Sequence, residues 1–458
     1  MRRVPLLLLP LLLSGCINLA PDYSRPAAPV AAQWPAGASG TQSAEIDWRG
    51  FFVDARLRQT VQLALANNRD LRVAALNVEY QRAQYRIQRA ALFPELDATA
   101  SGSRARSTSS SAPTSVSSSY SVGLGVSSYE LDLFDRLGNL RDAALQSYLS
   151  LEQTRRSTQI SLVAEVASAW MTLASDQQLL KLASDTYASQ QKTYALVQHS
   201  HGLGGESGVS LAQSRQTVES ARAEVANYQS QVEQDRNALD LLVGAPLDAS
   251  LLPDAGPLNS ALLVSVPAGL PSSLLQRRPD VLAAEHTLMA ANADIGAARA
   301  AFFPSVTLTA SGGSTSGELS GLFKSGSRAW SFAPSINLPI FDAGSNRASL
   351  DAAKVTRDID VASYEKTLQT AFSEVADALS VRGHISERLD AQQAYTDAAQ
   401  KAYDLSLALY QQGSDSFLDV LDAQRSLYSA QQTLISLKLT EQNNRVTLYK
   451  VLGGGWQG

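Results

Sequence analysis

The chain has 458 residues, of which 43 are acidic and 38 basic, so a formal net charge of -5 argues against nucleic-acid binding. Although 45% of the residues are hydrophobic, no run of eighteen apolar residues occurs, which excludes an ordinary transmembrane helix. One cysteine and four histidines exclude an internal disulfide and leave little material for a metal site.

Residues 1–15 have the pattern of a secretory signal peptide. Two arginines precede an apolar run, 4–13, that is too short to span a bilayer. The run ends in Leu-Ser-Gly-Cys16, which resembles the bacterial lipobox and predicts that Cys16 carries covalent lipid, including palmitate. An ordinary signal peptide followed by a stray cysteine is the alternative. Ile17, where aspartate would favour retention in the inner membrane, indicates sorting to the outer membrane, with 16–53 as an extended lipidated segment.

The remainder of the chain is a tandem duplication. Residues 89–102 match 299–312 at an offset of 210, with nine of fourteen positions identical. We therefore expect one repeat over 54–246 and a second over 272–455, joined by a Pro- and Leu-rich linker, 247–271. A repeat of this length holds several elements of its own, unlike the short units of a solenoid.

Each repeat begins with a predicted helix followed by a predicted hairpin. The helices cover 55–92 and 273–303, and each stops at a Phe-Pro step, Pro94 or Pro304, because proline cannot continue a helix. Apolar and polar residues then alternate, which predicts half-apolar strands. These strands are expected at 94–106, 119–131, 304–313 and 329–340, with Ser/Gly-rich loops between the two strands of each pair.

Each repeat ends with a long helix and a returning helix. The stretch 139–201 contains neither glycine nor proline, and its 63 residues at ~1.5 Å per residue predict a rod of roughly 95 Å. The four predicted helices are 136–201, 209–243, 343–412 and 416–452. Apolar residues recur every seven positions from Leu211 to Leu239, which predicts a coiled-coil seam.

Four amphipathic strands raise a problem of closure. Known membrane barrels begin at eight strands, and an open sheet leaves its edges exposed. Such a chain must either pack the sheet on its own helices or share a barrel between subunits.

The order of elements, given twice, together with residues 16–23, 129–134, 410–413 and 417–425, resembles the TolC-like outer-membrane factor family in its lipidated NodT/OprM-type branch. The resemblance covers the chain from Cys16 to about 455. It implies a homotrimer in which three chains contribute four strands each to a twelve-stranded β-barrel in the outer-membrane lipid. A long periplasmic α-helical barrel would continue it, with 247–271 in an equatorial region.

The resemblance also implies the function. It predicts a passive exit duct of a tripartite efflux pump, conducting drugs or other small molecules. Its partners would be a periplasmic adaptor (membrane fusion) protein and an inner-membrane RND-type transporter. A type I secretion duct and a non-conducting lipoprotein scaffold of coiled coils remain alternatives.

Two groups of candidate site residues follow from the same resemblance. The family places the start of the last helix at the periplasmic gate, which here corresponds to Leu418, Asp419, Asp422 and Arg425. By residue type alone, two carboxylates in a first helical turn are favoured by the helix dipole in any protein. The adaptor-docking tips are the two reversals, with Gly202, Gly204, Gly205, Gly208, Gly413 and Ser414; glycines also serve simply to turn the chain.

We expect no enzymatic activity, no metal and no cofactor other than the lipid on Cys16. His286 and His384 lie in helical stretches without a nucleophile pattern or a phosphate loop. His199 and His201 could bind a metal as a His-x-His pair, but they fit better as solvated residues near a helix C-terminus.

Overall fold

The computed structural model describes residues 17–31, 34, 47–109, 112–256, 262–264 and 272–454. The predicted signal peptide and Cys16 lie outside these residues. The described chain forms two compact units. Unit 1 takes 17–27, Asn77–Glu152 and Ala283–Glu365, and unit 2 takes the remainder. The mixture of long helices and one sheet confirms the predicted fold class at this level.

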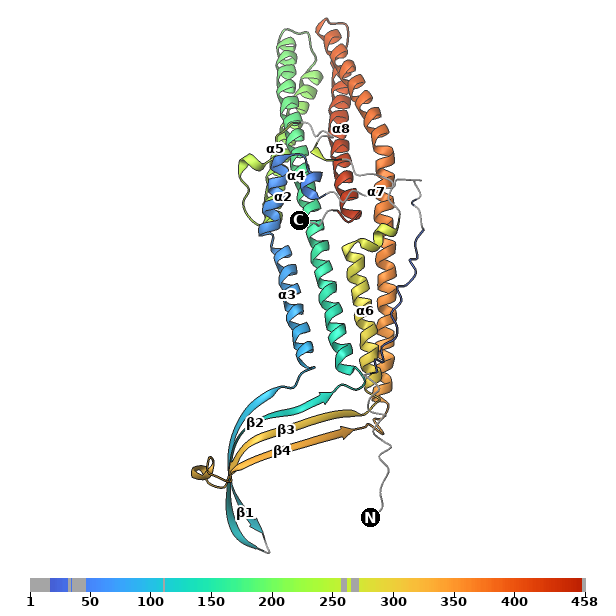
Figure 1. The fold of residues 1–458 in the computed structure, drawn as a ribbon. Coiled ribbons are helices and arrows are strands. Elements are labelled where there is room, and N and C mark those ends of the chain that lie inside the picture. The colour runs from blue at the N-terminus through green and yellow to red at the C-terminus, as the bar shows by residue number, and fades with distance from the viewer. Residues whose placement is uncertain are drawn as a thin grey trace. The chain divides into compact units, whose positions relative to one another are not determined.

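Unit 1 is built on a four-stranded antiparallel sheet with strand order β1-β2-β3-β4. The strands are β1 (Leu96–Ser109), β2 (Ala112–Leu131), β3 (Ser305–Ser316) and β4 (Arg328–Asn337), with a short 3-10 turn, η5 (Leu319–Gly321), before β4. The sheet is strongly curved along its strands (Figure 1). The unit also contains most of α6 (Pro279–Ala300). It takes residues 77–90 of α3 (Arg69–Ala90), 136–152 of α4 (Arg136–Gly202) and 345–365 of α7 (Ser345–Gln411).

The register gives the sheet one apolar and one polar face, as the alternation predicts. Leu124 lies opposite both Ala98 and Gly312, and Gly312 lies opposite Trp330. Side chains of directly opposed residues share a face. The other face carries serines and threonines, with hydroxyl contacts between Ser101 and Ser121 (2.8 Å) and between Ser311 and Ser331 (2.7 Å).

A β-bulge keeps both halves of β2 in phase with this pattern. The register shifts between Val126 and Tyr129, and Ser128 has a φ of 54°. Beyond the extra residue, Tyr129 lies opposite Leu308 and Leu131 lies opposite Val306. The bulge therefore moves the apolar positions of β2 from even to odd numbers without moving them to the polar face.

All four strands differ in extent from the prediction. β1 and β3 start two and one residues later than predicted, and each ends three residues later, at Ser109 and Ser316. β2 begins at Ala112 rather than 119, because the Ser-rich stretch 112–118 pairs with β1 through its backbone, which needs no apolar side chains. β4 ends at Asn337 rather than 340, just before Pro339, which has no amide hydrogen for a ladder.

The two central strands approach each other unusually closely on the polar face. Gly123 lies opposite Gly313, and a Cβ added to Gly313 would collide with the backbone of Val122 and Gly123. A Cβ at Gly123 would lie 2.9 Å from the carbonyl oxygen of Gly312. At Gly312, on the apolar face, nothing lies within 4 Å. The glycine pair thus permits the sheet to curl towards its polar face.

The N-terminal segment of unit 1, residues 17–27, is extended and is fixed by polar contacts to α6. The predicted extended segment 16–53 is not extended throughout, because Trp48–Phe51 in unit 2 form the short helix α1, which buries Trp48 and Phe51. Asn292 Nδ2 donates to the carbonyl oxygen of Pro21 (2.8 Å), and the Arg299 guanidinium donates to that of Leu19 (2.9 Å). The buried carboxylate of Glu285 receives two hydrogen bonds from Arg25 (2.6 and 2.8 Å).

Unit 2 is helical. Its elements are α1 (Trp48–Phe51), α2 (Ala55–Asn67), η2 (Ala249–Leu251), η4 (Ser272–Arg277), α5 (Gly208–Val243) and α8 (Phe417–Val451), with the greater parts of α4 (Arg136–Gly202) and α7 (Ser345–Gln411). Within this unit α5 doubles back along α4, and α8 along α7 (Figure 1). In the part of the chain that the structure describes, no helix is both long and apolar enough to cross a bilayer.

The predicted helix 55–92 is instead two helices, α2 and α3 (Arg69–Ala90). Asn68 separates them with a ψ of 133°, and its Oδ1 accepts from the amide of Leu71, so that it caps the start of α3. Its Nδ2 donates to the carbonyl oxygen of Leu242 (2.8 Å). In the second repeat the predicted helix 273–303 is divided into η4 and α6, and α6 starts at Pro279, a favoured first helical residue.

The same joint is made by a different residue in the second repeat. The buried Arg278 occupies the position of Asn68 and donates to the carbonyl oxygen of Val451 (2.9 Å). It also forms ion pairs with Asp280 (2.7 Å) and Glu374 (2.8 Å). Gly244 and Gly453, at φ of 77° and 83°, lie at the corresponding helix ends.

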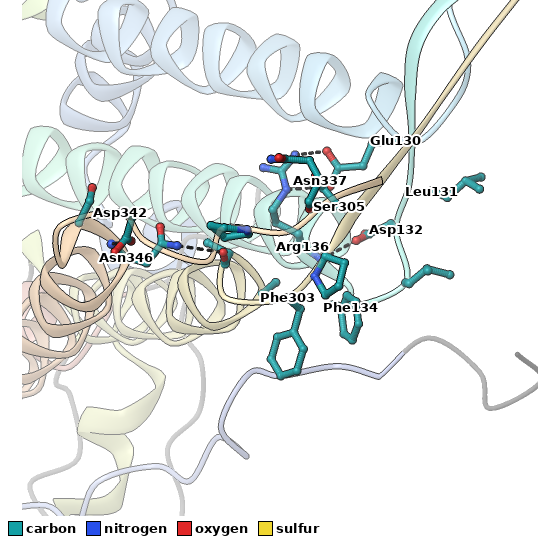
Figure 2. Close-up of a pocket in the computed structure, with 16 residues that line it drawn as sticks. Glu130, Leu131, Asp132, Phe134, Arg136, Phe303, Ser305, Asn337, Asp342 and Asn346 are labelled. Carbon is teal, nitrogen blue, oxygen red and sulfur yellow. Dashed lines mark hydrogen bonds and ion pairs between the residues drawn. The ribbon is translucent and has the colours of Figure 1, made fainter. Parts of the chain in front are cut away.

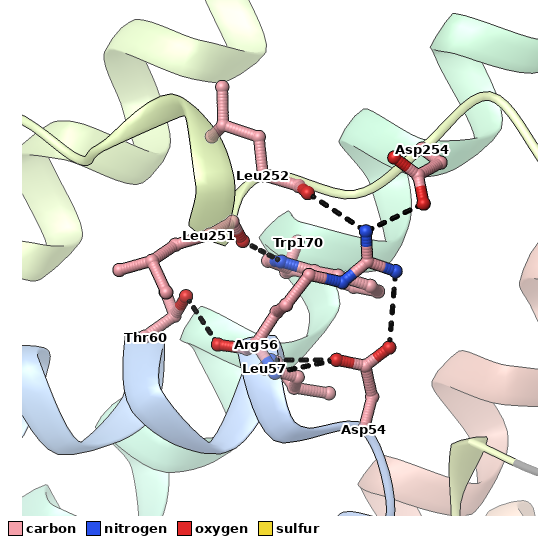
Figure 3. A network of polar contacts seen from close by, with 8 residues as sticks. All are labelled: Asp54, Arg56, Leu57, Thr60, Trp170, Leu251, Leu252 and Asp254. Carbon is pink, nitrogen blue, oxygen red and sulfur yellow. Dashed lines mark hydrogen bonds and ion pairs between the residues drawn. The ribbon is translucent and has the colours of Figure 1, made fainter.

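The main core of unit 2 is largely aliphatic, with a few aromatic side chains, and lies where α1 and α2 meet α4, α5 and α8. Phe51 and Tyr449 stack with their ring centroids 4.1 Å apart. At the edge of this core, Arg56 donates to Asp54 and Asp254. Trp170, whose ring belongs to the core, donates through Nε1 to the carbonyl oxygen of Leu251 (3.0 Å) (Figure 3). The network satisfies polar groups of α2, α4 and η2 that packing would otherwise leave unpaired.

Candidate functional site

The two hairpin tips of unit 2 are built in the same way. At the end of α4, the amides of Gly204 and Gly205 donate to the carbonyl oxygens of His201 (3.0 Å) and Ser200 (2.9 Å). At the end of α7, the amides of Gly413 and Ser414 donate to those of Tyr410 (2.9 Å) and Leu409 (3.0 Å). Both patterns are Schellman caps.

Only two of the predicted tip glycines need to be glycine for their backbone. Gly204 and Gly413 have φ of 80° and 73°, the left-handed conformation that the cap requires. Gly202 ends α4 and Gly208 begins α5, and both face open space. A Cβ at Gly205 would lie 2.9 Å from Ser200 Oγ, a side-chain atom that can move.

The structure brings the two tips together through a pair that the sequence analysis did not single out. The Tyr410 hydroxyl donates to Glu206 Oε1 (2.7 Å), and the backbone oxygen of Glu206 lies 2.8 Å from His201 Nδ1. Burial and this carboxylate raise the pKa of Tyr410 above its ordinary range. Glu206 and Tyr410 are 204 residues apart, and no spacing rule connects them.

An apolar cluster adjoins this contact, since Tyr410 packs against it. Val197, Phe417, Val420 and Leu421 are buried together, and four half-buried residues pack on them: Leu211, Tyr403, Leu407 and Tyr410. The start of α8 is therefore anchored by one helical face. The predicted gate residues lie on the other, since Leu418 is 52% exposed and Asp419 is exposed as well.

Among the described residues, the polar gate residues form hydrogen bonds and ion pairs only with near neighbours on the same helix or its cap. The Ser416 hydroxyl donates to Asp419 Oδ2 (2.6 Å), which lowers the pKa of Asp419. Asp422 and Arg425 form an exposed ion pair at 3.6 Å. Asp419 belongs to the N-terminal turn of α8, whereas Asp422 and Arg425 pair one turn further along the same helix.

A second carboxylate pair lies further along the hairpin of α4 and α5. Burial, with a further contribution from Asp235, raises the pKa of Asp176 to about 7. Asp235 Oδ2 is buried and, among the described residues, has no hydrogen-bond donor. A proton on Asp176 would supply that donor.

In unit 1, a cavity of about 400 Å³ lies where helices and strands join, lined by Pro304 among others (Figure 2). Arg136 forms two hydrogen bonds with the carboxylate of Glu130 (2.8 and 2.5 Å), and Phe134 stacks on Phe303 with centroids 4.6 Å apart.

Asp132 caps the start of α4 and Asp342 that of α7. Pro94 lies between α3 and β1, so both predicted junction prolines lie at helix-strand joints. We assign this cavity a structural role.

The histidines considered for metal or catalytic roles in the sequence all lie within long helices, α4, α6 and α7. Within the described ranges, no group of three or more His, Cys, Asp and Glu side chains is placed to hold a metal ion. His286 Nδ1 lies 2.8 Å from Gln146 Oε1, and burial lowers its pKa, in keeping with a packing role.

The paired helical hairpins and the two-faced sheet describe a membrane channel subunit, and comparison with known proteins gives its family. The model of the outer membrane efflux protein family matches residues 60–245 and 270–454. The antibiotic efflux pump outer membrane protein ArpC and the toluene efflux pump outer membrane protein TtgC, both of Pseudomonas putida, are each 52% identical to the chain. Each match covers 97% of this chain and 94% of the relative.

The solved structure of the MtrE outer membrane channel of Neisseria gonorrhoeae, in its open state, is also similar. It superposes with a TM-score of 0.87 at 40% identity, over 96% of this chain and 98% of that one. The protein belongs to the outer membrane efflux protein family. It is an outer-membrane protein and acts as the exit channel of an efflux pump.

Proposed function

We propose that three copies of this chain form one duct, in which three four-stranded sheets close into a twelve-stranded β-barrel. The observation that carries the proposal is the apolar face of the sheet. Its side chains are exposed in the single chain: Leu124 by 54%, Phe332 by 60%, Ile336 by 72% and Trp330 by 82%. A surface of this kind requires lipid or a partner to cover it.

The edges of the sheet support the same arrangement. Among the described residues, β1 and β4 each pair on one side only. Unpaired edges are avoided in membranes because lipid offers no hydrogen bonds, and closure removes them. Joining the β4 edge of one copy to the β1 edge of the next would satisfy both edges and place the apolar face in lipid.

The tips of unit 2 are the best candidates for contact with the other pump components. In the proposed duct they would meet a periplasmic adaptor and, through it, an RND-type inner-membrane transporter. The exposed gate residues Leu418, Asp419, Asp422 and Arg425 would face the axis, where rings of carboxylates attract cations. Their contacts within one chain are weak enough for docking to disturb.

The cargo is best sought among antibiotics and small apolar molecules such as toluene. The relatives named above are efflux pump proteins for an antibiotic and for toluene, and we extend those cargo classes to this chain. The polar face of the sheet would line the passage with serine and threonine hydroxyls, which bind no cargo strongly. The names of these relatives favour efflux over type I secretion.

Purified protein tests the proposal directly. We expect a trimer that migrates as such in detergent before heating and conducts ions in a planar bilayer. A monomer, or a trimer without conductance, would contradict it and would favour the alternative of a non-conducting envelope scaffold. Disulfide trapping between cysteines introduced on β1 and β4 provides a second measurement, because it should link copies only if these edges meet.

A further inference from the structure

Three arginines lie at one end of the apolar face. Arg104 and Arg106 occupy the last part of β1, and Arg328 begins β4; all three are exposed. Arg104 and Arg106 lie an even number of residues from Leu96 and Ala98 along β1, and therefore on the same, apolar face. Arg328 lies opposite Ser314, which in turn lies opposite Val122 on that face.

Their height along the strands places these arginines at a membrane boundary. From Leu96 to Arg106 is ten residues, or roughly 26 Å along the barrel axis at ~3.4 Å per residue and a tilt of ~40°. The lipid-facing apolar band of such barrels is ~25 Å tall. Arg106 thus reaches its upper limit, and Arg104, just below, is long enough to extend its guanidinium to the interface.

The surroundings fit an interface occupied by anions. Tyr120 and the exposed Trp330 lie on the same face near the arginines, as aromatic side chains do at membrane boundaries. Among the described residues none of the three arginines has a carboxylate partner. Glu318, in the turn before β4, is held near the Ser320 hydroxyl (3.4 Å). The positive charge is left for a partner outside the chain.

The duplication indicates how the arginines of two copies would meet; this step rests on the proposed trimer. Within the chain, Leu96 pairs with Val126 and Val306 with Ile336, so the hairpins correspond at an offset of 210. Transferring the β2-β3 register to the seam between copies places Phe332 opposite the partner subunit's Arg104 and Trp330 opposite the partner subunit's Arg106. Arg328 then lies one diagonal step from the partner subunit's Arg106.

We propose that Arg104 and Arg106 of one copy and Arg328 of the next form a site for the phosphate of a phosphorylated lipid headgroup in the outer leaflet, at each of the three seams. Guanidinium groups match phosphate with two parallel hydrogen bonds, and their long stems pack on apolar side chains. The lipid would bridge two subunits, with its acyl chains against the apolar face and its phosphate against the arginines.

Native mass spectrometry of the trimer with two probes tests the site: diphosphorylated lipid A and the same lipid with its phosphates removed. We expect the phosphorylated form to bind more tightly. Hydrogen bonds to charged groups make a loss of ~10-fold or more in affinity reasonable for Arg104→Gln/Arg106→Gln/Arg328→Gln. Arg104→Lys/Arg106→Lys/Arg328→Lys should retain part of the affinity.

The matched control is Arg69→Gln/Arg72→Gln/Arg86→Gln on α3, which removes the same charge from three exposed arginines outside the sheet. It should bind as the unaltered protein does. Equal affinity for both lipid forms, or equal loss in both triple variants, would overturn the site. Displacement of the lipid by inorganic phosphate at similar concentration would assign the arginines to free phosphate instead.

Assembly is measured in the same spectra, which separates the two proposals. If the unaltered chain is monomeric, the proposed trimer itself fails. If the trimer forms but does not prefer the phosphorylated lipid, only the lipid site fails. Arg328→Gln alone, at the edge of β4, should lower the affinity while the trimer persists.

Discussion

At the scale of single residues, the raised pKa of Asp176 beside Asp235 makes stability depend on pH. The pKa of Asp176 is about 7 in the folded protein, above its ordinary value of 3.8. Between these values the folded state binds more protons than the unfolded state, so stability falls as pH rises from about 4 to about 7. Above pH 7 both carboxylates are ionised in the folded protein, and their repulsion and burial lower the free energy of unfolding in full.

Asp176→Asn should therefore raise the thermal midpoint at pH 8 and leave it nearly unchanged at pH 4. Asn mimics the protonated carboxyl group, and its amide can donate to Asp235 Oδ2 at every pH. Asp185→Asn, on the same helix but paired with Lys181 at the surface, is the control. A gain at pH 8 no larger than that of the control would show that the pair does not share a proton.

The gate residues lead to a prediction about conductance. If Asp419 and Asp422 face the axis, then Asp419→Ala with Asp422→Ala should weaken block by multivalent cations and lower cation selectivity. Arg425→Ala should raise the resting conductance, because it leaves the carboxylates of the three copies without the cation that offsets their mutual repulsion. Bilayer recordings measure both, and unchanged cation block in the double variant would leave these carboxylates with a role only in the helix start.

At the scale of elements, the glycine pair between β2 and β3 provides a closely matched comparison. Gly313→Ala should impair trimer formation, since the new Cβ collides with the backbone of Val122 and Gly123. Overpacking of this kind costs ~1 to 3 kcal/mol. Gly312→Ala places the same methyl group on the next residue, in open space, and should assemble normally. The measurement is the trimer yield of the two variants after detergent extraction, which should be lower for Gly313→Ala than for Gly312→Ala.

The two faces of the sheet predict opposite tolerance to charge. Leu124→Arg or Ile336→Arg places a cation on the apolar face, at a cost of about 2 to 4 kcal/mol near the bilayer midplane. Trimer assembly should suffer. Thr99→Arg on the polar face should be tolerated; Thr309 is less suitable as a control because its hydroxyl accepts from the amide of Ser128 at the bulge. Equal damage on both faces would contradict the assignment.

The sequence predicts most of the helices and strands but few of the contacts between them. Periodicity and the two Phe-Pro steps suffice to place the long helices within two residues and most strand ends within three, the exception being the start of β2. The sequence does not predict the break at Asn68, because Asn also occurs within helices. Its cap on the amide of Leu71 is local, but its side chain is also held by the carbonyl oxygen of Leu242, 174 residues away. The Glu206–Tyr410 contact was hidden for the same reason: local spacing carries no information about which tips meet.

At the scale of the whole molecule, anchoring remains a prediction, because Cys16 lies outside the described residues. Cys16→Ser should block lipid attachment and leave unprocessed precursor. The strands should still insert into the membrane by themselves, so we expect reduced yield with residual function. Labelled palmitate is the measurement, and its incorporation into the Cys16→Ser variant would show that the lipobox assignment is wrong.

The glycine pair also bears on the cross-section of the proposed barrel. At the offset of 210, Gly123 corresponds to Ala333 and Gly313 to Ser103, so the seam between copies would carry Cβ atoms where the middle of each sheet has none. Strands that keep their Cβ atoms on the concave side cannot bend as sharply. Three tight bends, one within each subunit, would then alternate with three flatter seams, and the lumen would be a rounded triangle whose corners are set by glycine.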